Sequence, residues 1–563
     1  MLKKRNKKIL WSLIGAGAVA LTVVPLSVGL ASCSSSGQTA TTTEAQKDVS
    51  KFLTTQAFNG FLNNNHGRFA GNFSNFTNVK SDNTGLEGIT GAFTNKDLEK
   101  HLAHPLTETI DPNKDNYGSY HAYLYLKNEI KQMGYQDNNP EGLVKYPAQG
   151  TVTEVAGQNG KMTKTYTAAQ GTLENKEHGV TMRAEDSKDL KPMLKKDGFI
   201  TQGFLWNGSD NANGIAGTTY NNVGNNLVVT INPTMAKADN ATIKDVFIIS
   251  HYDSTAYAES KDGTRHYGDI IKGHQSWGAT DNGTGVSVNL ALLKYYSQPE
   301  NRNSLGVRLH IMFSDAEEEG VMGTYAFVTS FVKSNKTTEG VEQNELLKNT
   351  LSVINMDTVA GGDHTYIHAR GGTAHKKMTL VRDQIEAVSQ RRAKELNDPT
   401  QALEIHPALS RAESQDDSFL EAGETGDWSD HEPFYEQGVA TAYFESTNFD
   451  IWSKNHMYDG YSQVKNPAAW ILKNGEHVDL KQTKINGGVL SKYDWPAGHD
   501  KKSDWLLTGD IWHSDLDTPE FMIKTFGNRI FLQMDTVFHS LEAYLRTIYD
   551  FNPDNQTFTY MNQ

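Results

Sequence analysis

The chain has 563 residues, of which 37% are hydrophobic and 21% are charged, and its formal net charge at pH 7 is −14. This length and composition are those of a globular protein with a large apolar core. The negative charge argues against nucleic acid as a partner, because phosphate binding needs a basic face, and it would suit a protein that attracts cations.

The first 33 residues have the pattern of a targeting segment. Basic residues between Lys3 and Lys8 precede an apolar run from Ile9 to Ala31. The run ends in Leu-Ala-Ser-Cys, which resembles the lipobox of bacterial lipoproteins and implies cleavage of the signal and lipidation of Cys33. This cysteine is the only one in the chain, which excludes an intramolecular disulfide. The alternative is an uncleaved transmembrane anchor. Both place the body of the protein outside the cytoplasmic membrane, and we expect a lipid anchor at the extracellular face.

Apolar periodicity predicts the elements that follow. Residues 34–50 are rich in serine and threonine and indicate a flexible linker. Residues 51–105 are expected to form an N-terminal extension, and the segment from about Val49 to Lys80 shows no clean period. Helices are predicted at 118–135, 286–296 and 521–549, and strands at 226–231, 246–250, 307–313, 351–355 and 439–444. Irregular insertions are expected near 136–225 and 449–504. Alternating strands and helices predict an α/β fold with a mixed, largely parallel central sheet and helices on both faces.

Seven side chains could bind a metal ion or transfer protons, and most of them follow the end of a predicted strand. They are His251, Asp253, Asp281, Glu317, Glu318, Asp357 and His513. Carboxyl ends of parallel strands meet at one edge of an open sheet, so we expect these residues to converge. Imidazoles and carboxylates without thiolates suit Zn²⁺, and two ions about 3.5–4 Å apart could share a carboxylate and activate water. The alternative for the three successive glutamates, Glu317 to Glu319, is a solvated acidic turn.

Six motifs occur in a fixed order between Tyr117 and Tyr549. They are H-Y-D-S, G-A-T-D-N-G-T-G, E-E-E-G-V-M-G-T, N-M-D-T, S-D-H-E-P-F and W-H-S-D-L-D-T. Together they resemble the M28 family of zinc aminopeptidases, here in a bacterial lipoprotein form. The resemblance implies a zinc exopeptidase-like, phosphorylase/hydrolase-like fold over residues 106–563. It also implies two Zn²⁺ per chain and the hydrolysis of N-terminal residues from peptides.

The same resemblance implies a role for each motif residue. Asp281 would bridge both ions, with His251 and Asp357 completing one ion and Glu318 and His513 completing the other. Glu317 would be the general base and acid, Asp253 would hydrogen-bond His251, and Glu319 would be a bystander. His431 and Trp512 are expected near the substrate or behind a ligand, and His431 is the rival of His513 for the last metal position. A non-proline cis peptide is expected at Asp281–Asn282.

Two other functions are compatible with parts of the pattern. Many peptidases of this family have a tyrosine near the site, whereas Trp512 precedes His513 here and offers only an indole N–H. Glutaminyl cyclases share the fold, bind one zinc and cyclise N-terminal glutamine. Against a cyclase, the glutamate run continues directly into V-M-G-T and Asp281 is followed by N-G-T-G. A non-catalytic surface-binding lipoprotein would have lost ligands, and none of the five is missing.

Overall fold

The computed structural model describes residues 44–63, 92–93, 118–148, 150–156, 162–206, 222–254, 257–259, 265–267, 278–333, 335–337, 340–342, 344–371, 376–405, 421–449, 462–472, 505–509, 511–513 and 516–561. The predicted signal segment with Cys33 lies outside the described residues, as do most of the N-terminal extension and of the 449–504 insertion. None of the described helices is long and apolar enough to cross a membrane.

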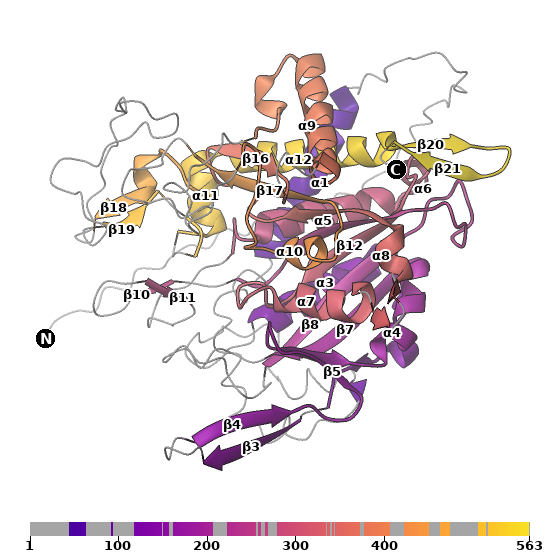
Figure 1. Cartoon of the computed structure of the whole chain (residues 1–563). Coiled ribbons are helices and arrows are strands. Elements are labelled where there is room, and N and C mark those ends of the chain that lie inside the picture. Colours follow the sequence, from indigo (N-terminus) through magenta and orange to yellow (C-terminus); the bar gives the residue numbers. More distant parts are fainter. Residues whose placement is uncertain are drawn as a thin grey trace, which may run out of the picture. The chain divides into compact units, whose positions relative to one another are not determined.

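A nine-stranded sheet forms the centre of the described fold (Figure 1). Its strands run in the spatial order β16-β17-β15-β9-β12-β8-β7-β6-β5. Their bounds are β5 (Thr172–Asn175), β6 (Val180–Arg183), β7 (Gly198–Trp206), β8 (Asn222–Ile231), β9 (Asp245–His251), β12 (Arg308–Ser314), β15 (Thr350–Met356), β16 (His364–His368) and β17 (Thr441–Thr447). The five predicted strands correspond to β8, β9, β12, β15 and β17, so these predictions are confirmed.

The sheet is mixed, as predicted, but it is parallel only at its centre. Strands β12, β9, β15 and β17 run parallel to one another. Strand β16 and the successive strands β8, β7, β6 and β5 pair antiparallel. The segment 136–225, expected as an insertion, therefore supplies strands β5 to β7 of the central sheet. The four central strands still bring their carboxyl ends to one edge.

Helices cover both faces of the sheet. Along β9, Val246 and Ile248 belong to one apolar cluster, and Phe247 and Ile249 belong to another, because successive side chains point to opposite faces. The first cluster includes side chains of α1 (Glu44–Asn63), α3 (Gly118–Gln132), α5 (Gly283–Tyr296), α9 (Lys376–Leu396) and α12 (Arg529–Thr547). The second includes side chains of α7 (Met322–Phe327), α8 (Glu345–Asn349) and α10 (Glu432–Tyr435). Burial of both faces explains why every residue of β9 is buried.

The long C-terminal helix predicted at 521–549 is broken. Helix α11 (Pro519–Phe526) ends at Gly527, and α12 begins at Arg529. Gly527 has φ 58° and ψ −127°, a conformation that only glycine adopts readily, so the amphipathic pattern continues across a turn. Tyr549, predicted to be the last helical residue, instead begins β20 (Tyr549–Asn552).

Helix α1 packs against the helices that cover the sheet. It begins at Glu44, inside the predicted linker 34–50, and its residues Phe58, Phe61 and Leu62 are at most 1% exposed. The ring of Phe58 meets that of Phe531 edge to face at 5.6 Å between centroids. The sequence of this segment has no clean helical period. Packing against the body of the protein holds the helix in place.

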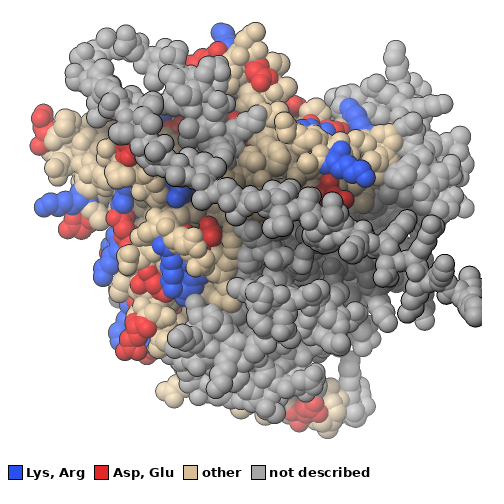
Figure 2. Space-filling view, turned by 180° about the vertical axis from the view of Figure 1, so that it is seen from behind, with Lys and Arg blue, Asp and Glu red and all other residues tan. Residues whose placement is uncertain are grey.

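The remaining elements are short. They are β1 (Ala92–Phe93), β2 (Val144–Lys145), β3 (Thr151–Ala156), β4 (Met162–Thr167), α4 (Asp186–Asp189), β10 (Tyr257–Glu259), β11 (Arg265–Tyr267), α6 (Pro299–Arg302), β13 (Asn335–Thr337), β14 (Gly340–Glu342), β18 (Trp470–Leu472), β19 (Trp505–Thr508) and β21 (Thr557–Tyr560). On the face in Figure 2, acidic and basic side chains of the described residues are interspersed.

Candidate metal centre

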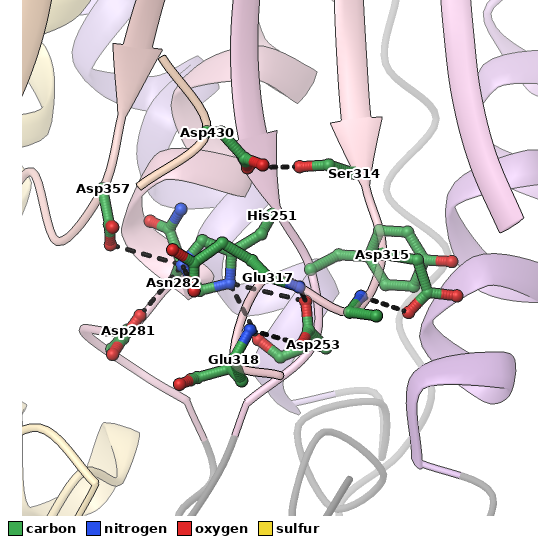
Figure 3. Close-up of polar contacts among 12 residues, drawn as sticks. His251, Asp253, Asp281, Asn282, Ser314, Asp315, Glu317, Glu318, Asp357 and Asp430 are labelled. Carbon is green, nitrogen blue, oxygen red and sulfur yellow. Dashed lines mark hydrogen bonds and ion pairs between the residues drawn. The ribbon is translucent and has the colours of Figure 1, made fainter. Parts of the chain in front are cut away.

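Five of the predicted site residues lie at the carboxyl edge of the parallel strands, as Figure 3 shows: His251, Asp281, Glu317, Glu318 and Asp357. His251 is the last residue of β9, and its backbone is in register with Ser314, the last residue of β12. Glu317 and Glu318 follow β12, and Asp357 directly follows β15. Asp281 comes two residues before α5, the helix that links β9 to β12. Sheet topology therefore gathers side chains that are remote in sequence.

The side chains form two groups that share one carboxylate. In the first group, His251 Nε2 lies 3.0 Å from Asp281 Oδ1 and 3.2 Å from Asp357 Oδ1. In the second, His513 Nε2 lies 2.9 Å from Asp281 Oδ2 and 2.8 Å from Glu318 Oε2. The ligand atoms within each group lie within 4.8 Å of one another. The two oxygens of Asp281 thus face different imidazoles, which is the arrangement of a bridging carboxylate.

Glu317 lies beside the first group without belonging to either. Its Oε2 is 4.0 Å from His251 Nε2, and its side chain is 10% exposed. Glu319, the third glutamate, is partly buried and also belongs to neither group. Three successive glutamates therefore occupy three different environments, and they do not form a solvated turn.

Asp253 hydrogen-bonds His251, as expected, and it does so through its backbone carbonyl. His251 Nδ1 lies 3.1 Å from the backbone carbonyl of Asp253, and 3.6 Å from its carboxylate Oδ1. The carboxylate oxygens instead accept the backbone N–H groups of Glu317 at 3.2 Å and of Glu318 at 3.1 Å. The carbonyl can only accept, so it holds a proton on Nδ1 of His251, and Nε2 is the atom that would face a cation between the carboxylates. The carboxylate fixes the turn that carries both glutamates.

A second turn supports Asp357 from the S-D-H-E-P-F motif. Ser429 Oγ donates to Asp357 Oδ2 at 2.8 Å and accepts from Asn355 Nδ2 at 2.8 Å. Asp430 accepts the hydroxyls of Ser314 and Thr324, each at 2.5 Å. The motif therefore ties the end of β12 and the start of α7 to the Asp357 side of the site. The sequence alone predicted no role for Ser429 or Asp430, although both belong to the S-D-H-E-P-F motif.

The loop before α5 has the predicted cis peptide bond at Asp281–Asn282. The Asn282 side chain donates to the carbonyl of Met356 at 2.7 Å and accepts the N–H of Thr358 at 3.2 Å. It also accepts the N–H of Gly285 at 3.1 Å, as the N-cap of α5. Asn282 thus joins the Asp281 loop to the two residues that flank Asp357.

Two further predicted residues lie apart from the ligand atoms. His431 is fully buried, and its Nε2 lies 2.8 Å from the carbonyl of Gly426. It belongs to neither group, and His513 occupies the place for which both were considered. Trp512 is 7% exposed, and its ring lies against that of His513, with 3.8 Å between ring centroids and 39° between the ring planes. Trp512 therefore packs against the imidazole of His513.

The charges of the site are strongly coupled. Burial by itself would lower the pKa of His513, but Glu318 and Asp281 outweigh it and raise that pKa to about 10. His251 shows the same balance, in which Glu317 and Asp357 hold its pKa well above the ordinary value. Burial and neighbouring carboxylates raise the pKa of Glu317 well above its ordinary range, and burial raises that of Glu318 to about 7. The buried carboxylates therefore stabilise a positive charge that lies between them.

The donor set fits divalent cations. Each group offers one imidazole nitrogen and two carboxylates, with Asp281 counted in both. Burying several carboxylates this close is costly unless cations compensate them. Nitrogen and oxygen ligands in this number suit Zn²⁺ sites that keep a position open for water or substrate.

The comparison with protein families agrees with this geometry. Residues 226–474 match the model of the family described as "Peptidase family M28". The match covers residues 226–474 and supports a zinc-dependent hydrolase of the metallopeptidase class. The matched segment includes every residue of the two groups except His513, which the fold brings in from outside it.

Individual relatives are more distant. The alkaline phosphatase isozyme conversion protein of Escherichia coli K12 is 26% identical over 260 residues, and the match spans 45% of this chain and 64% of that relative. A vacuolar membrane protease of Arthroderma otae is 44% identical over 62 residues, which are 11% of this chain and 6% of the relative. The chain therefore matches less than two thirds of the length of these curated relatives.

Solved structures resemble the fold only loosely. A zinc aminopeptidase from Bacillus subtilis aligns with a TM-score of 0.30 at 16% identity, over 57% of this chain and 50% of that chain. A glutaminyl cyclase from Porphyromonas gingivalis aligns with a TM-score of 0.33 at 11% identity, over 89% and 97% of the two chains.

Zinc binding should release protons, because neighbouring carboxylates raise the pKa of His251 and of His513 above the ordinary value despite their burial. A cation reaches Nε2 of His251 or His513 only after the proton leaves. We expect calorimetric titrations in buffers of different ionisation enthalpy to report at least about one proton released per chain. The apparent affinity should fall about tenfold or more per pH unit between pH 8 and pH 6. An affinity that does not change over this range would contradict the pairing of the imidazoles with the carboxylates.

Proposed function

We propose that this protein is a two-zinc aminopeptidase that hydrolyses N-terminal residues from peptides outside the cell. The observation that carries the proposal is the position of Asp281, whose two carboxylate oxygens each face the imidazole of a different group. One zinc would be held by His251, Asp281 and Asp357. The other would be held by His513, Asp281 and Glu318. Bound Zn²⁺ would polarise the scissile carbonyl and lower the pKa of water toward about 7.

Proton transfer would fall to Glu317. It is the glutamate nearest to the first group that belongs to neither, so its carboxylate stays available. In the proposed reaction this carboxylate takes the proton of the attacking water and returns it to the amine that leaves. The raised pKa of Glu317 suits a group that must hold this proton between the two steps. Asp253 would keep Glu317 in place through the backbone N–H that it accepts.

Replacing Glu317 tests this assignment. Glu317→Gln has almost the same shape but cannot accept a proton, so we expect kcat to fall by about 10²–10⁴-fold. Zinc content should be unchanged, because Glu317 lies outside both groups. The matched control is Glu319→Gln, which changes the neighbouring bystander and should keep activity within about threefold. Equal losses in the two variants would remove Glu317 from its proposed role.

The substrate class separates the aminopeptidase from a glutaminyl cyclase. A positively charged N-terminal amine suits a site lined by carboxylates. The metal content of the purified chain should be near two ions, because both groups are complete, whereas a cyclase binds one. We expect release of free amino acids from a panel of aminoacyl anilides and no cleavage of N-acetylated analogues. Ring closure of glutaminyl peptides without hydrolysis, together with one ion per chain, would favour the cyclase.

Absence of both reactions would favour a third function, a surface-binding lipoprotein without catalysis. The five complete ligand positions argue against it, since a binding module has no need to keep them. The same panel of substrates therefore tests all three functions.

We propose further that the enzyme is anchored by lipid at Cys33, on the extracellular face of the membrane. The support is the sequence alone, in which an apolar run ends at the chain's only cysteine. The wild-type chain should partition into the detergent phase of a Triton X-114 extract and incorporate labelled fatty acid. Cys33→Ala should incorporate none, because the acceptor thiol is gone. Equal labelling of the two chains would contradict lipidation at this residue.

A further inference from the structure

A carboxylate that neither group uses lies behind the shared Asp281. Asp517 is fully buried and lies four residues after His513, just before α11. Its Oδ1 accepts the backbone N–H of Thr280 at 2.6 Å, and its Oδ2 lies 3.3 Å from the backbone nitrogen of Asp281. Its own carbonyl accepts the N–H of Ala279 at 3.4 Å. Three successive peptide groups before the cis bond are therefore held by one residue.

These contacts join the two ends of the second group. The Asp281 loop and the His513 segment are more than 200 residues apart in sequence, since Thr280 and Asp517 are separated by 237 positions. Asn282 makes the equivalent connection on the other side, to the peptides that flank Asp357. Asp281 is therefore held from the His513 side by Asp517 and from the Asp357 side by Asn282.

Asp253 provides an independent example of the same device. Its buried carboxylate accepts the successive N–H groups of Glu317 and Glu318. A carboxyl group offers two acceptor oxygens in one plane. A carboxylate that accepts two neighbouring peptides fixes both the position and the orientation of the loop between them. Loops that carry ligands need this support, because a loop lacks the regular backbone hydrogen bonds of a strand or helix.

We propose that Asp517 is a positioning residue that sets the distance between the shared Asp281 and His513, and so the affinity of the second cation position. It touches neither substrate nor reacting atoms, and it acts through the backbone of Thr280 and Asp281. The inference rests on the proposed two-zinc function. It predicts that loss of Asp517 weakens the group of Asp281, Glu318 and His513 more than the group that contains Asp357.

The test is a zinc titration of metal-free protein. Wild type should bind two equivalents. In Asp517→Asn an amide N–H₂ replaces one acceptor oxygen and opposes a peptide N–H, so one equivalent should bind about 10- to 100-fold more weakly. The other equivalent should stay within about threefold of wild type, since its separate support through Asn282 and Ser429 is intact. With Co²⁺ in place of Zn²⁺, the visible absorption of the weaker equivalent should also change.

Two further variants separate positioning from charge and from general damage. Asp517→Glu keeps the negative charge but moves the oxygens by one methylene, so a positioning role predicts weakened binding of the same equivalent. Full affinity in Asp517→Glu would mean that charge alone matters and would overturn the inference. Asp535→Asn removes another buried carboxylate, on α12, whose Oδ2 lies 3.6 Å from Arg392 Nη2. This control should bind both equivalents as wild type does.

The outcomes distinguish this inference from the function on which it rests. If wild type binds fewer than two equivalents, the two-zinc function fails and the inference fails with it. If wild type binds two and Asp517→Asn binds both within threefold, only the inference is overturned. Equal weakening of both equivalents, with a lower unfolding temperature of the metal-free protein than in Asp535→Asn, would show a merely structural role and would also overturn it.

Discussion

The site depends on one buried carboxylate between two imidazoles. The oxygens of Asp281 lie 3.0 Å from His251 Nε2 and 2.9 Å from His513 Nε2. Around it, further acidic side chains are almost completely removed from water. Carboxylates in such surroundings repel one another and lose hydration, so the folded protein must supply compensating charge or hydrogen bonds. Some of these acids face the imidazoles, others accept backbone N–H groups, and Asp430 accepts the hydroxyls of Ser314 and Thr324.

That division connects the fold to the chemistry. Parallel strands β9, β12 and β15 deliver their last residues to one edge, but a sheet edge alone does not fix loops to a fraction of an ångström. Asp253 and Asp517 supply the missing precision by accepting peptide N–H groups from the loops that carry Glu318 and Asp281. Around Asp357 the support comes from donors instead, since Asn282 donates to the carbonyl of Met356 and Ser429 donates to the Asp357 carboxylate. A site of this kind is built from hydrogen bonds between loops, on a scaffold built from apolar burial.

Much of this arrangement follows from the sequence, for identifiable reasons. The strands β9, β12 and β15 are short apolar runs, and each ends where a polar residue begins, so both the strand and its chemistry could be read. The partners of Asp253 and Asp517 could not be read in this way. Backbone N–H groups carry no sequence signal, and the Thr280 peptide lies 237 positions from Asp517. Strands β5 to β7 were missed as part of the central sheet because antiparallel pairing depends on tertiary contacts. The glycine at 527 is present in the sequence, but the apolar pattern continues across it, so the pattern predicts one helix instead of two.

The most direct test is anomalous X-ray diffraction at the zinc edge, from crystals of the full chain grown with zinc. The account predicts two peaks, one on each side of the Asp281 carboxylate, with His251 and Asp357 around the first and His513 and Glu318 around the second. A single peak at this edge of the sheet, or zinc bound only elsewhere on the chain, would contradict it.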